Sequence, residues 1–311
     1  MRVSFNALSD TVIGQLGDIG SAQVRLQRQA ASGQRIASAD QDPLGAQRLL
    51  DSRAETEQLA QFAKNISRQR DVATVTQGTI QSLQTVADRA GEIATRAVGL
   101  NASQDLSQYA TEVNQLLEQA LNTANRKYGD GYLLSGTNTR QAPFAATRDS
   151  SGQITGITYQ GNNGTGDVDI AQGESIDVRI PGSNSTGSGT TGLLADTRTG
   201  ADLFAHLITL RDHLRSGDVT SINSTDAGRL VADGNHLIDQ LGMNAATIAR
   251  LDTATSANAS RSASVAQRTS SITDVDLAET LTDLTRTQTA YQVALQTGAK
   301  ILNLSLMDYL H

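Results

Sequence analysis

Histidines and aspartates are the side chains of this sequence best suited to metal binding or acid–base chemistry. The four histidines are His206, His213, His236 and His311. Asp202, His206 and His213 would share one face of an expected helix. Seven helical residues separate the two histidines by about 10 Å along the axis, which is too far for both to bind one metal ion. We therefore interpret the histidines as solvent-facing or helix-packing side chains.

A glycine-rich segment matches by letter the fingerprint of dinucleotide-binding enzymes. It reads Gly187-Ser188-Gly189-Thr190-Thr191-Gly192. The fingerprint needs a strand before it and repeating β-α-β units around it, whereas this chain offers long helices and an isolated β-rich segment. We interpret it as a flexible loop. The chain also has no cysteine, which excludes thiolate nucleophiles, cysteine metal sites and disulfide bonds.

Two aspartates near the end of the chain could form an acid–base pair. Thr273, with Asp276 three residues later, resembles a capping box at the expected start of the last helix, and Asp274 lies between them. Side chains of these types at a helix start accept hydrogen bonds from the unpaired N–H groups of the first turn and favour the helix dipole. We therefore interpret them as capping residues. The sequence predicts no catalytic residue, no cofactor and no metal ligand, and so a protein that is not an enzyme.

Composition favours long helices over one large globular core. Hydrophobic residues make up 38% of the 311 residues, aromatic residues only 3%, and tryptophan is absent. The net charge of -7 argues against nucleic-acid binding, which needs a basic surface. No run of about 18 apolar residues is present, so we expect no helix that spans a membrane. The first residues lack a charged segment followed by an apolar run, so we expect no cleavable secretory signal.

The two ends of the chain carry helical stripes of apolar residues that neither end can bury alone. From Leu277 to Leu302 the stripe advances in steps of four and three, the spacing of a coiled coil, with Gln288 and Gly298 as its weak positions. A similar stripe follows the N-terminal segment. We predict that the stripes pair with each other or with copies from neighbouring chains. The residues expected to mediate this self-assembly are Phe5, Leu8, Val12, Leu16, Ile19, Leu26, Leu281, Leu284, Tyr291, Leu295, Leu302 and Leu306.

Between the ends, the sequence predicts a helical bundle interrupted by a β-rich segment. Two apolar stripes run side by side over residues 59–97, so this long helix needs two neighbours. Beyond Tyr128, short alternating runs separated by Gly, Asn and Ser replace the helical pattern. Strands are expected at 154–159, 168–170 and 176–180. Helical spacing returns at Ala201 and continues in a second long helix that begins near Ser224.

The expected fold class is mainly α with a β-rich insertion. The N- and C-terminal halves would form a long antiparallel helical bundle or coiled coil, with a small β-domain at the tip. The expected domains are a terminal helical domain of residues 1–40 and 272–311, a long-helix bundle of residues 41–139 and 196–271, and an outer β-rich domain of residues 140–195.

Two blocks of the sequence resemble the flagellin superfamily. They are Ala31-Ser32-Gly33-Gln34-Arg35-Ile36, continued by residues 38–43, and the segment Ser271–Glu279. Within that superfamily the chain is more similar to the hook–filament junction proteins, the family of flagellar hook-associated protein 3, than to filament flagellins. That similarity rests on the opening Met1–Ser4, on Tyr132–Thr139 with Pro143-Phe144, on Ile157–Gly161 and Ile176–Gly182, and on the ending Leu304–Leu310.

This resemblance implies a structural subunit of the bacterial flagellum. Proteins of this family form a ring that joins the hook to the filament, between a hook-side junction protein and the first flagellin subunits. They leave the cell unfolded through the flagellar type III export channel, and a cytoplasmic chaperone binds their C-terminal region. The chain is thus expected to be extracellular and to form a homo-oligomeric ring. Its terminal helices would become ordered on assembly, because ordering them alone costs conformational entropy without burial in return.

Two alternatives stay open from the sequence. One is a short filament flagellin, which would polymerise by itself. The other is a flagellin-like surface protein whose β-domain grips a carbohydrate or a receptor. The aromatic residues available for such a site are few, and we expect Tyr132, Phe144 and Tyr159 to lie in the core.

Overall fold

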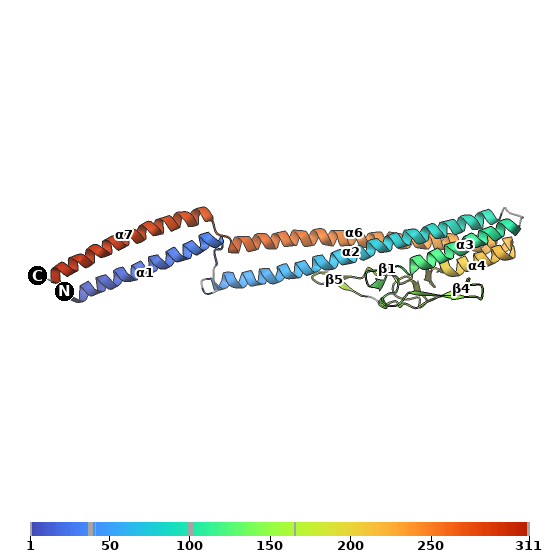
Figure 1. Ribbon diagram of the computed structural model, residues 1–311, viewed down its shortest axis with the longest axis horizontal. Coiled ribbons are helices and arrows are strands. Elements are labelled where there is room, and N and C mark those ends of the chain that lie inside the picture. Colours follow the sequence, from blue (N-terminus) through green and yellow to red (C-terminus); the bar gives the residue numbers. More distant parts are fainter. Residues whose placement is uncertain (1, 37–39, 41, 99–102, 165, 310–311) are drawn as a thin grey trace. The chain divides into compact units, whose positions relative to one another are not determined.

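The computed structural model describes residues 2–36, 40, 42–98, 103–164 and 166–309; at 2–9, 103–104 and 301–309 it describes the helical backbone only (Figure 1). The helices are α1 (Arg2–Ser32), α2 (Pro43–Ala97), α3 (Ser103–Ala124), α4 (Leu203–Ser216), α5 (Val219–Ser221), the π-helical turn η1 (Ile222–Asp226), α6 (Ala227–Thr273) and α7 (Leu277–Tyr309). The strands are β1 (Lys127–Tyr128), β2 (Gly131–Tyr132), β3 (Phe144–Arg148), β4 (Ile154–Tyr159), β5 (Val168–Ala171), β6 (Glu174–Ile176), β7 (Ser183–Asn184), β8 (Ala195–Asp196) and β9 (Ala201–Asp202). The predicted fold class is confirmed.

The chain forms two compact units, residues 1–59 with 260–311 and residues 60–259. The division into three domains drawn from the sequence stays a prediction.

Helix α2 begins at a capping residue, Asp42. Asp42 accepts a hydrogen bond from Gly45 N–H at 2.8 Å, and Pro43 takes the first helical position. Gly78 and Gly91 lie inside the helix without interrupting it, although a helical glycine costs about 1 kcal/mol relative to alanine. The fully buried apolar side chains that flank both glycines offset this cost.

In the unit of residues 1–59 and 260–311, α1 and α7 lie side by side (Figure 1). Gly20 faces Tyr291, and Gly298 faces Val12. Because the numbers rise along one helix as they fall along the other, the two helices run antiparallel.

The segments next to this pair are fixed by hydrogen bonds to one another. Gly33 ends α1 with a φ of +70°, a conformation that glycine adopts without strain. Arg35 N–H then donates to Thr273 O at 2.6 Å, and Val275 N–H donates to Gly33 O at 3.1 Å. The Arg35 guanidinium also donates to Ile272 O at 2.9 Å. These bonds set the point from which α1 and α7 pair.

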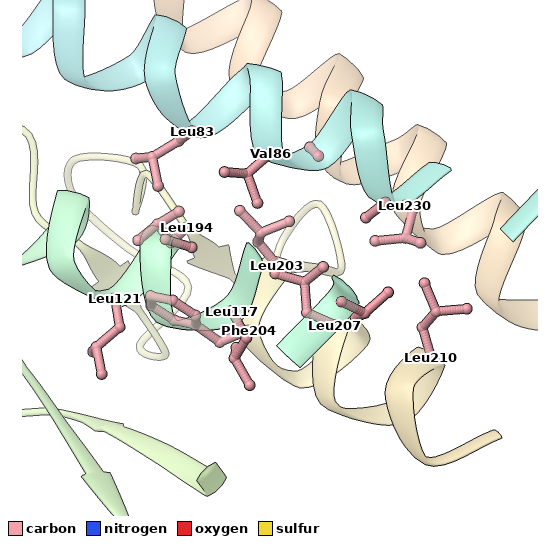
Figure 2. Close-up of a cluster of buried hydrophobic side chains, with 14 of the residues drawn as sticks. Leu83, Val86, Leu117, Leu121, Leu194, Leu203, Phe204, Leu207, Leu210 and Leu230 are labelled. Carbon is pink, nitrogen blue, oxygen red and sulfur yellow. The ribbon is translucent and has the colours of Figure 1, made fainter. Parts of the chain in front are cut away.

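The unit of residues 60–259 has its core between α2, α3, α4 and α6 (Figure 2). Helix α2 buries residues from both predicted stripes, Leu83 from one and Val86 and Ile93 from the other. The other labelled side chains of this core are Leu117, Leu121, Leu194, Leu203, Phe204, Leu207, Leu210 and Leu230. The burial of both stripes is the reason that α2 needs more than one neighbour.

The β-rich segment consists of short hairpins packed against the helices of the same unit. Strands β1–β2, β3–β4 and β5–β6 form antiparallel pairs, and β7, β8 and β9 form a small sheet in that order. The Phe144 ring of β3 lies 5.1 Å from the Phe204 ring of α4, which attaches that hairpin to the helical core. The β5–β6 hairpin packs Ile170 and Ile176 into a second cluster with Ile66 of α2.

Strand β4 has the predicted bounds, but the strand predicted at 176–180 is wrong in extent. Strand β6 ends at Ile176. Asp177 follows and accepts hydrogen bonds from Gly166 N–H at 2.8 Å and from Arg179 N–H at 3.0 Å. A side chain that bonds nearby backbone groups in this way competes with strand pairing. Val178 is buried nonetheless, and this explains why its surroundings look strand-like in the sequence.

Candidate functional site

The histidines of α4 have separate acidic partners. His206 Nδ1 lies 2.7 Å from Asp233 Oδ2, and His213 Nδ1 lies 2.6 Å from Asp226 Oδ2. Both carboxylates are 1% exposed. Since seven residues separate both the histidines and their partners, the two pairs lie two turns apart; they tie α4 to the end of η1 through Asp226 and to α6 through Asp233. These side chains pack helices together, as the sequence predicts.

The glycine-rich segment is organised by hydrogen bonds instead of being the flexible loop that we expected. The buried Asn184 donates to Ser188 O and Thr190 O, both at 2.7 Å. The buried His236 of α6 lies 2.8 Å from Gly192 O. A dinucleotide fingerprint opens onto a helix, whereas this segment leads into β8. It therefore has a structural explanation that involves no phosphate group.

The aspartates near the last helix are hydrogen-bond acceptors, with one correction to the predicted cap. Asp276 accepts from Glu279 N–H at 3.1 Å and so caps α7. Thr273 is the last residue of α6, and α7 begins only at Leu277. Thr273 therefore does not cap the last helix. Asp274 accepts from the hydroxyl groups of Ser270 and Thr273, and the Ser270 bond lowers the Asp274 pKa. Both carboxylates are thus committed to local structure.

The aromatic residues of the β-rich segment are likewise engaged in contacts within the chain. Phe144 is buried, and the Tyr159 hydroxyl donates to Leu134 O at 2.9 Å. Burial raises the Tyr159 pKa to about 12. Tyr132 lies under the ammonium of Lys127, which is 4.9 Å from the ring centre. These contacts leave the three rings poorly placed to form a sugar-binding platform.

Among the described residues, no three His, Cys, Asp or Glu side chains are grouped so that they could hold a metal ion. In the same part of the chain, no helix combines the length and the apolar character needed to cross a membrane.

The α1–α7 pair brings together part of the predicted self-assembly set. The half-buried members are Val12, Leu16, Ile19, Leu26, Leu284 and Tyr291. Leu281 and Leu295 are 53% and 46% exposed. The remaining members, Phe5, Leu8, Leu302 and Leu306, lie outside the residues whose side chains are described.

The side of α7 that faces α1 follows the predicted stripe only at Leu284, Tyr291 and Gly298. This inner seam advances in steps of four and three through Thr280, Leu284, Thr287, Tyr291, Ala294 and Gly298. Thr280 and Gly298 are buried, whereas Leu281 and Leu295, which follow seam residues, lie along its edge. Small residues let the helices approach closely, and the larger leucines remain on the border of the contact. Sequence spacing pointed to the right helix face only approximately.

Helix α7 also has an outer face that the sequence analysis missed. A shallow groove of about 880 Å³ lies over Thr282, Thr285, Arg286, Thr289, Ala290, Val293 and Thr297, and its lining reaches the inner seam at the half-buried Ala294. The hydroxyls of Thr282 and Thr289 donate to the carbonyls of Ala278 and Thr285, four residues earlier, at 2.8 and 3.0 Å. Because these hydroxyls are already bonded, the threonines present methyl groups outward. The sequence analysis treated threonine as a polar residue and therefore did not identify this face as apolar.

Comparisons with known proteins agree with this architecture. Residues 3–139 match the family model described as the bacterial flagellin N-terminal helical region. Among solved structures, the chain is similar to a flagellar hook-associated protein of Vibrio parahaemolyticus, with 19% identity, a TM-score of 0.63, and coverage of 75% of this chain and 100% of that chain. The chain has the fold of a hook-associated protein.

Two more structures share the hook-associated fold. FlgL of Bacillus cereus is 17% identical, with a TM-score of 0.57 and coverage of 71% of this chain and 99% of that one. The flagellar junction protein FlgL of Legionella pneumophila is 14% identical, with a TM-score of 0.56 and coverage of 72% and 100%. No curated protein sequence matches the chain.

The resemblance to the flagellin superfamily and to hook-associated protein 3 is thereby confirmed. The family and the solved structures that the chain resembles are those of flagellar proteins. The comparisons support a structural role in the bacterial flagellum.

Proposed function

We propose that the chain is a subunit of an adaptor ring that joins the hook of a bacterial flagellum to its filament. The observation that carries the proposal is the apolar surface left uncovered by the α1–α7 pair. Leu277, Leu281 and Leu295 are 50%, 53% and 46% exposed, although each lies beside the inner seam. Pairing within one chain leaves these leucines in water, and neighbouring copies would cover them.

The small burial within the pair supports assembly-dependent ordering of the ends. None of the described side chains of α1 is buried, and Thr280 and Gly298 are the buried ones among those described in α7. Ordering a residue costs about 1–2 kcal/mol, whereas complete burial of a leucine side chain gains about 1.5–3 kcal/mol. The free energy gained by half-burying a few apolar residues does not offset the entropy cost of ordering two helices. Burial against other subunits is therefore required.

The proposed position between hook and filament is supported by the kind of solved structure that the chain resembles. Solved structures named as hook-associated or junction proteins are matched over nearly their whole length. By analogy, the subunit would contact a hook-side junction protein on one side and flagellin on the other. Its localisation would be the flagellum outside the cell.

Export provides a reason for the weakly packed ends. We expect the chain to pass unfolded through the flagellar type III channel. The exposed leucines of α7 would need cover in the cytoplasm, and a chaperone bound to the C-terminal region would supply it. A weak α1–α7 contact keeps unfolding for export easy.

Deletion of the gene followed by electron microscopy tests the role. The expected result is hooks without filaments, with flagellin shed into the medium, and recovery of filaments when the wild-type gene is restored. Filaments of normal length on the hooks of the deletion strain would contradict the proposal.

A filament subunit is the second candidate, and the match of residues 3–139 to the flagellin model favours it. The discriminating test is polymerisation of the purified protein. Long filaments formed by this protein alone would favour the flagellin reading, whereas short or closed assemblies would favour the ring.

A further inference from the structure

The two histidine–aspartate pairs of α4 differ in how completely their carboxylates are bonded. Asp233 Oδ2 lies 2.7 Å from His206 Nδ1, and Asp233 Oδ1 accepts a hydrogen bond from Asp202 N–H at 3.0 Å. Asp226 Oδ2 lies 2.6 Å from His213 Nδ1, but Asp226 Oδ1 is buried without a partner. Among the described residues it is the one buried side-chain oxygen or nitrogen left in this state. The chain thus offers two buried carboxylates in similar settings, of which only one has both oxygens bonded.

The unpaired oxygen of Asp226 lowers the free energy needed to open its surroundings. A polar atom that leaves water for the protein interior without a new hydrogen bond destabilises the closed state. Opening the contact between His213 and Asp226 returns Asp226 Oδ1 to water and so recovers this loss. Opening the other pair recovers nothing of this kind, because both oxygens of Asp233 already have partners in the closed state. The Asp226 end of α4 is therefore held less firmly than the Asp233 end.

The backbone around Asp226 is irregular as well. Helix α4 ends before Gly217, whose φ is +71°, and α5 has three residues. Ile222–Asp226 then form the π-helical turn η1, in which Ala227 N–H donates to Ile222 O, five residues earlier. Such turns are rare and occur often at functional positions. Asp226 thus lies where the chain departs from regular α-helical bonding, between α4 and the long helix α6.

The middle of α4 is fixed by a different contact. Arg211 is 3% exposed and donates to Ile154 O of β4 at 2.6 Å. Nearer the start of α4, Leu207 lies within the labelled core (Figure 2). Beyond Arg211, the buried apolar side chains that precede Asp226 are Leu214 and Ile222. A segment with so few buried side chains is suited to local opening.

We propose that residues 212–226 form a release segment, which opens before the rest of the unit of residues 60–259 and begins the unfolding of its core. Asp226 favours this opening because its unpaired oxygen then reaches water. Arg211 and Asp233 keep the first part of α4 in place until the release segment has opened. The inference rests on the proposed function, because a chain that passes unfolded through an export channel has to lose this core.

Native-state amide hydrogen exchange of the purified full-length protein, read by mass spectrometry, tests the release segment. In the wild type, residues 212–226 should exchange faster than residues 203–211. Asp226→Leu removes the unpaired oxygen and keeps the number of side-chain heavy atoms, and the His213 ring, which is 29% exposed, can donate to water instead. The expected result is exchange in residues 212–226 that is about tenfold slower than in the wild type, with exchange in residues 203–211 unchanged.

Asp233→Leu is the matched variant at the other pair. It leaves Asp202 N–H and the His206 ring, which is only 12% exposed, without their acceptor. Exchange in residues 203–211 should therefore become about tenfold faster. If circular dichroism shows that leucine disturbs the fold at either site, Asp226→Ala and Asp233→Ala repeat the comparison without added bulk. Asp233→Ala should then accelerate exchange in α4 several-fold more than Asp226→Ala does.

Three results overturn the inference. The first is exchange in residues 212–226 that is no faster than in residues 203–211 of the wild type. The second is a folded Asp226→Leu protein in which exchange in residues 212–226 is unchanged or faster, which would mean that a water molecule satisfies Asp226 Oδ1. The third is an equal effect of the two alanine variants.

The proposed function stands or falls separately, because exchange is measured on the purified protein. If Asp226→Leu fails to slow exchange but the deletion strain lacks filaments, only the release segment is wrong. If exchange follows the expectation but the deletion strain keeps its filaments, only the role in the flagellum is wrong.

Discussion

Val12 of α1 lies directly over Gly298 of α7. A Cβ placed on Gly298 would be 3.3 Å from Val12 Cγ1, which is tighter than an ordinary contact. Gly298 is also one of the few buried residues described in α7. In the sequence this glycine looks like a gap in an apolar stripe. In the structure its missing side chain is what allows the two terminal helices to approach.

Gly298→Val is expected to loosen the α1–α7 pair, because the branched side chain would meet Val12. Overpacking of this kind costs about 1–3 kcal/mol. The measurement is amide hydrogen exchange in α1 and α7 of the assembled protein, which should become faster in the variant.

Two alanine variants provide the control for that experiment. Gly298→Ala and Gly14→Ala both remove a helical glycine, which by itself stabilises a helix by about 1 kcal/mol. A Cβ on Gly14 meets nothing within 4 Å, so only Gly14→Ala should slow exchange. Equal slowing by both variants would show that Val12 does not crowd Gly298.

The ionised carboxylate of Asp196 is expected to stabilise the fold, and this stabilisation should be lost when acid protonates it. Its buried carboxylate pairs with Arg198 at 2.7 Å and accepts from Gly192 N–H at 2.9 Å, and the bond to Arg198 holds the Asp196 pKa well below its usual range. A lowered carboxyl pKa stabilises the fold above the unfolded pKa of about 4, and this stabilisation is lost as pH falls through the folded value. Asp196→Asn should therefore lower the free energy of unfolding at pH 7 by about 2 kcal/mol.

Thermal unfolding as a function of pH checks this expectation. The gap between the wild type and Asp196→Asn should narrow as the pH is lowered below about 4. A gap of constant size from pH 7 into strong acid would mean that the charge on Asp196 does not contribute.

The ionised carboxylate of Asp202 is expected to destabilise the fold at neutral pH, which is opposite to the effect of Asp196. Burial raises the Asp202 pKa, against the effect of its hydrogen bond from Ala205 N–H at 3.1 Å. A raised carboxyl pKa means that the folded state binds the proton more tightly than the unfolded chain. The charged form therefore costs stability above the unfolded pKa of about 4, and protonation in acid removes that cost.

Asp202→Asn keeps the capping acceptor of α4 and removes the charge. The melting temperature of this variant should exceed that of the wild type at pH 7, and the two should converge in acid. A lower melting temperature at pH 7 would show that the cap needs the carboxylate.

The sequence predicts the helices well where apolar periodicity is strong, and it predicts poorly which face meets which partner. Steps of three and four residues define α7, but they fit the stripe through Leu281 and Leu295 as well as the inner seam through Thr280 and Ala294. In the structure the inner seam faces α1, because its small residues allow the two helices to approach closely. This approach depends on the surface of α1 and cannot be read from the spacing in α7. The hydrogen-bonded segment around Asn184 was missed for a similar reason: its order comes from one side chain that bonds several distant carbonyls, and composition does not reveal such bonds.

Limited proteolysis of the monomer should remove α1 and α7 before it cuts the unit of residues 60–259. The reason is burial, since the apolar core side chains of the structure lie mainly in that unit, and proteases cut segments that open easily. We expect a resistant fragment of about 40–270, identified by mass spectrometry. Resistance of α1 and α7 equal to that of the central fragment would contradict assembly-dependent ordering.

Leu295→Asp is expected to abolish incorporation of the protein into flagella while leaving residues 60–259 folded. Leu295 is 46% exposed at the edge of the α1–α7 contact, so an aspartate there stays in water in the monomer and costs little. In an assembly the same position would be covered, and a buried unpaired carboxylate is strongly unfavourable. Leu302→Asp carries the same expectation from the sequence.

Swimming motility and the circular dichroism spectrum of the purified variant separate these effects. Gln296→Asp is the matched control, because it adds the same charge at an exposed position of α7 that is one residue away and therefore on a different side of the helix. The spectrum should stay unchanged in both variants, and motility should be lost only in Leu295→Asp. Normal swimming with Leu295→Asp would mean that no other subunit covers this edge, since a covered aspartate without a partner would not be tolerated.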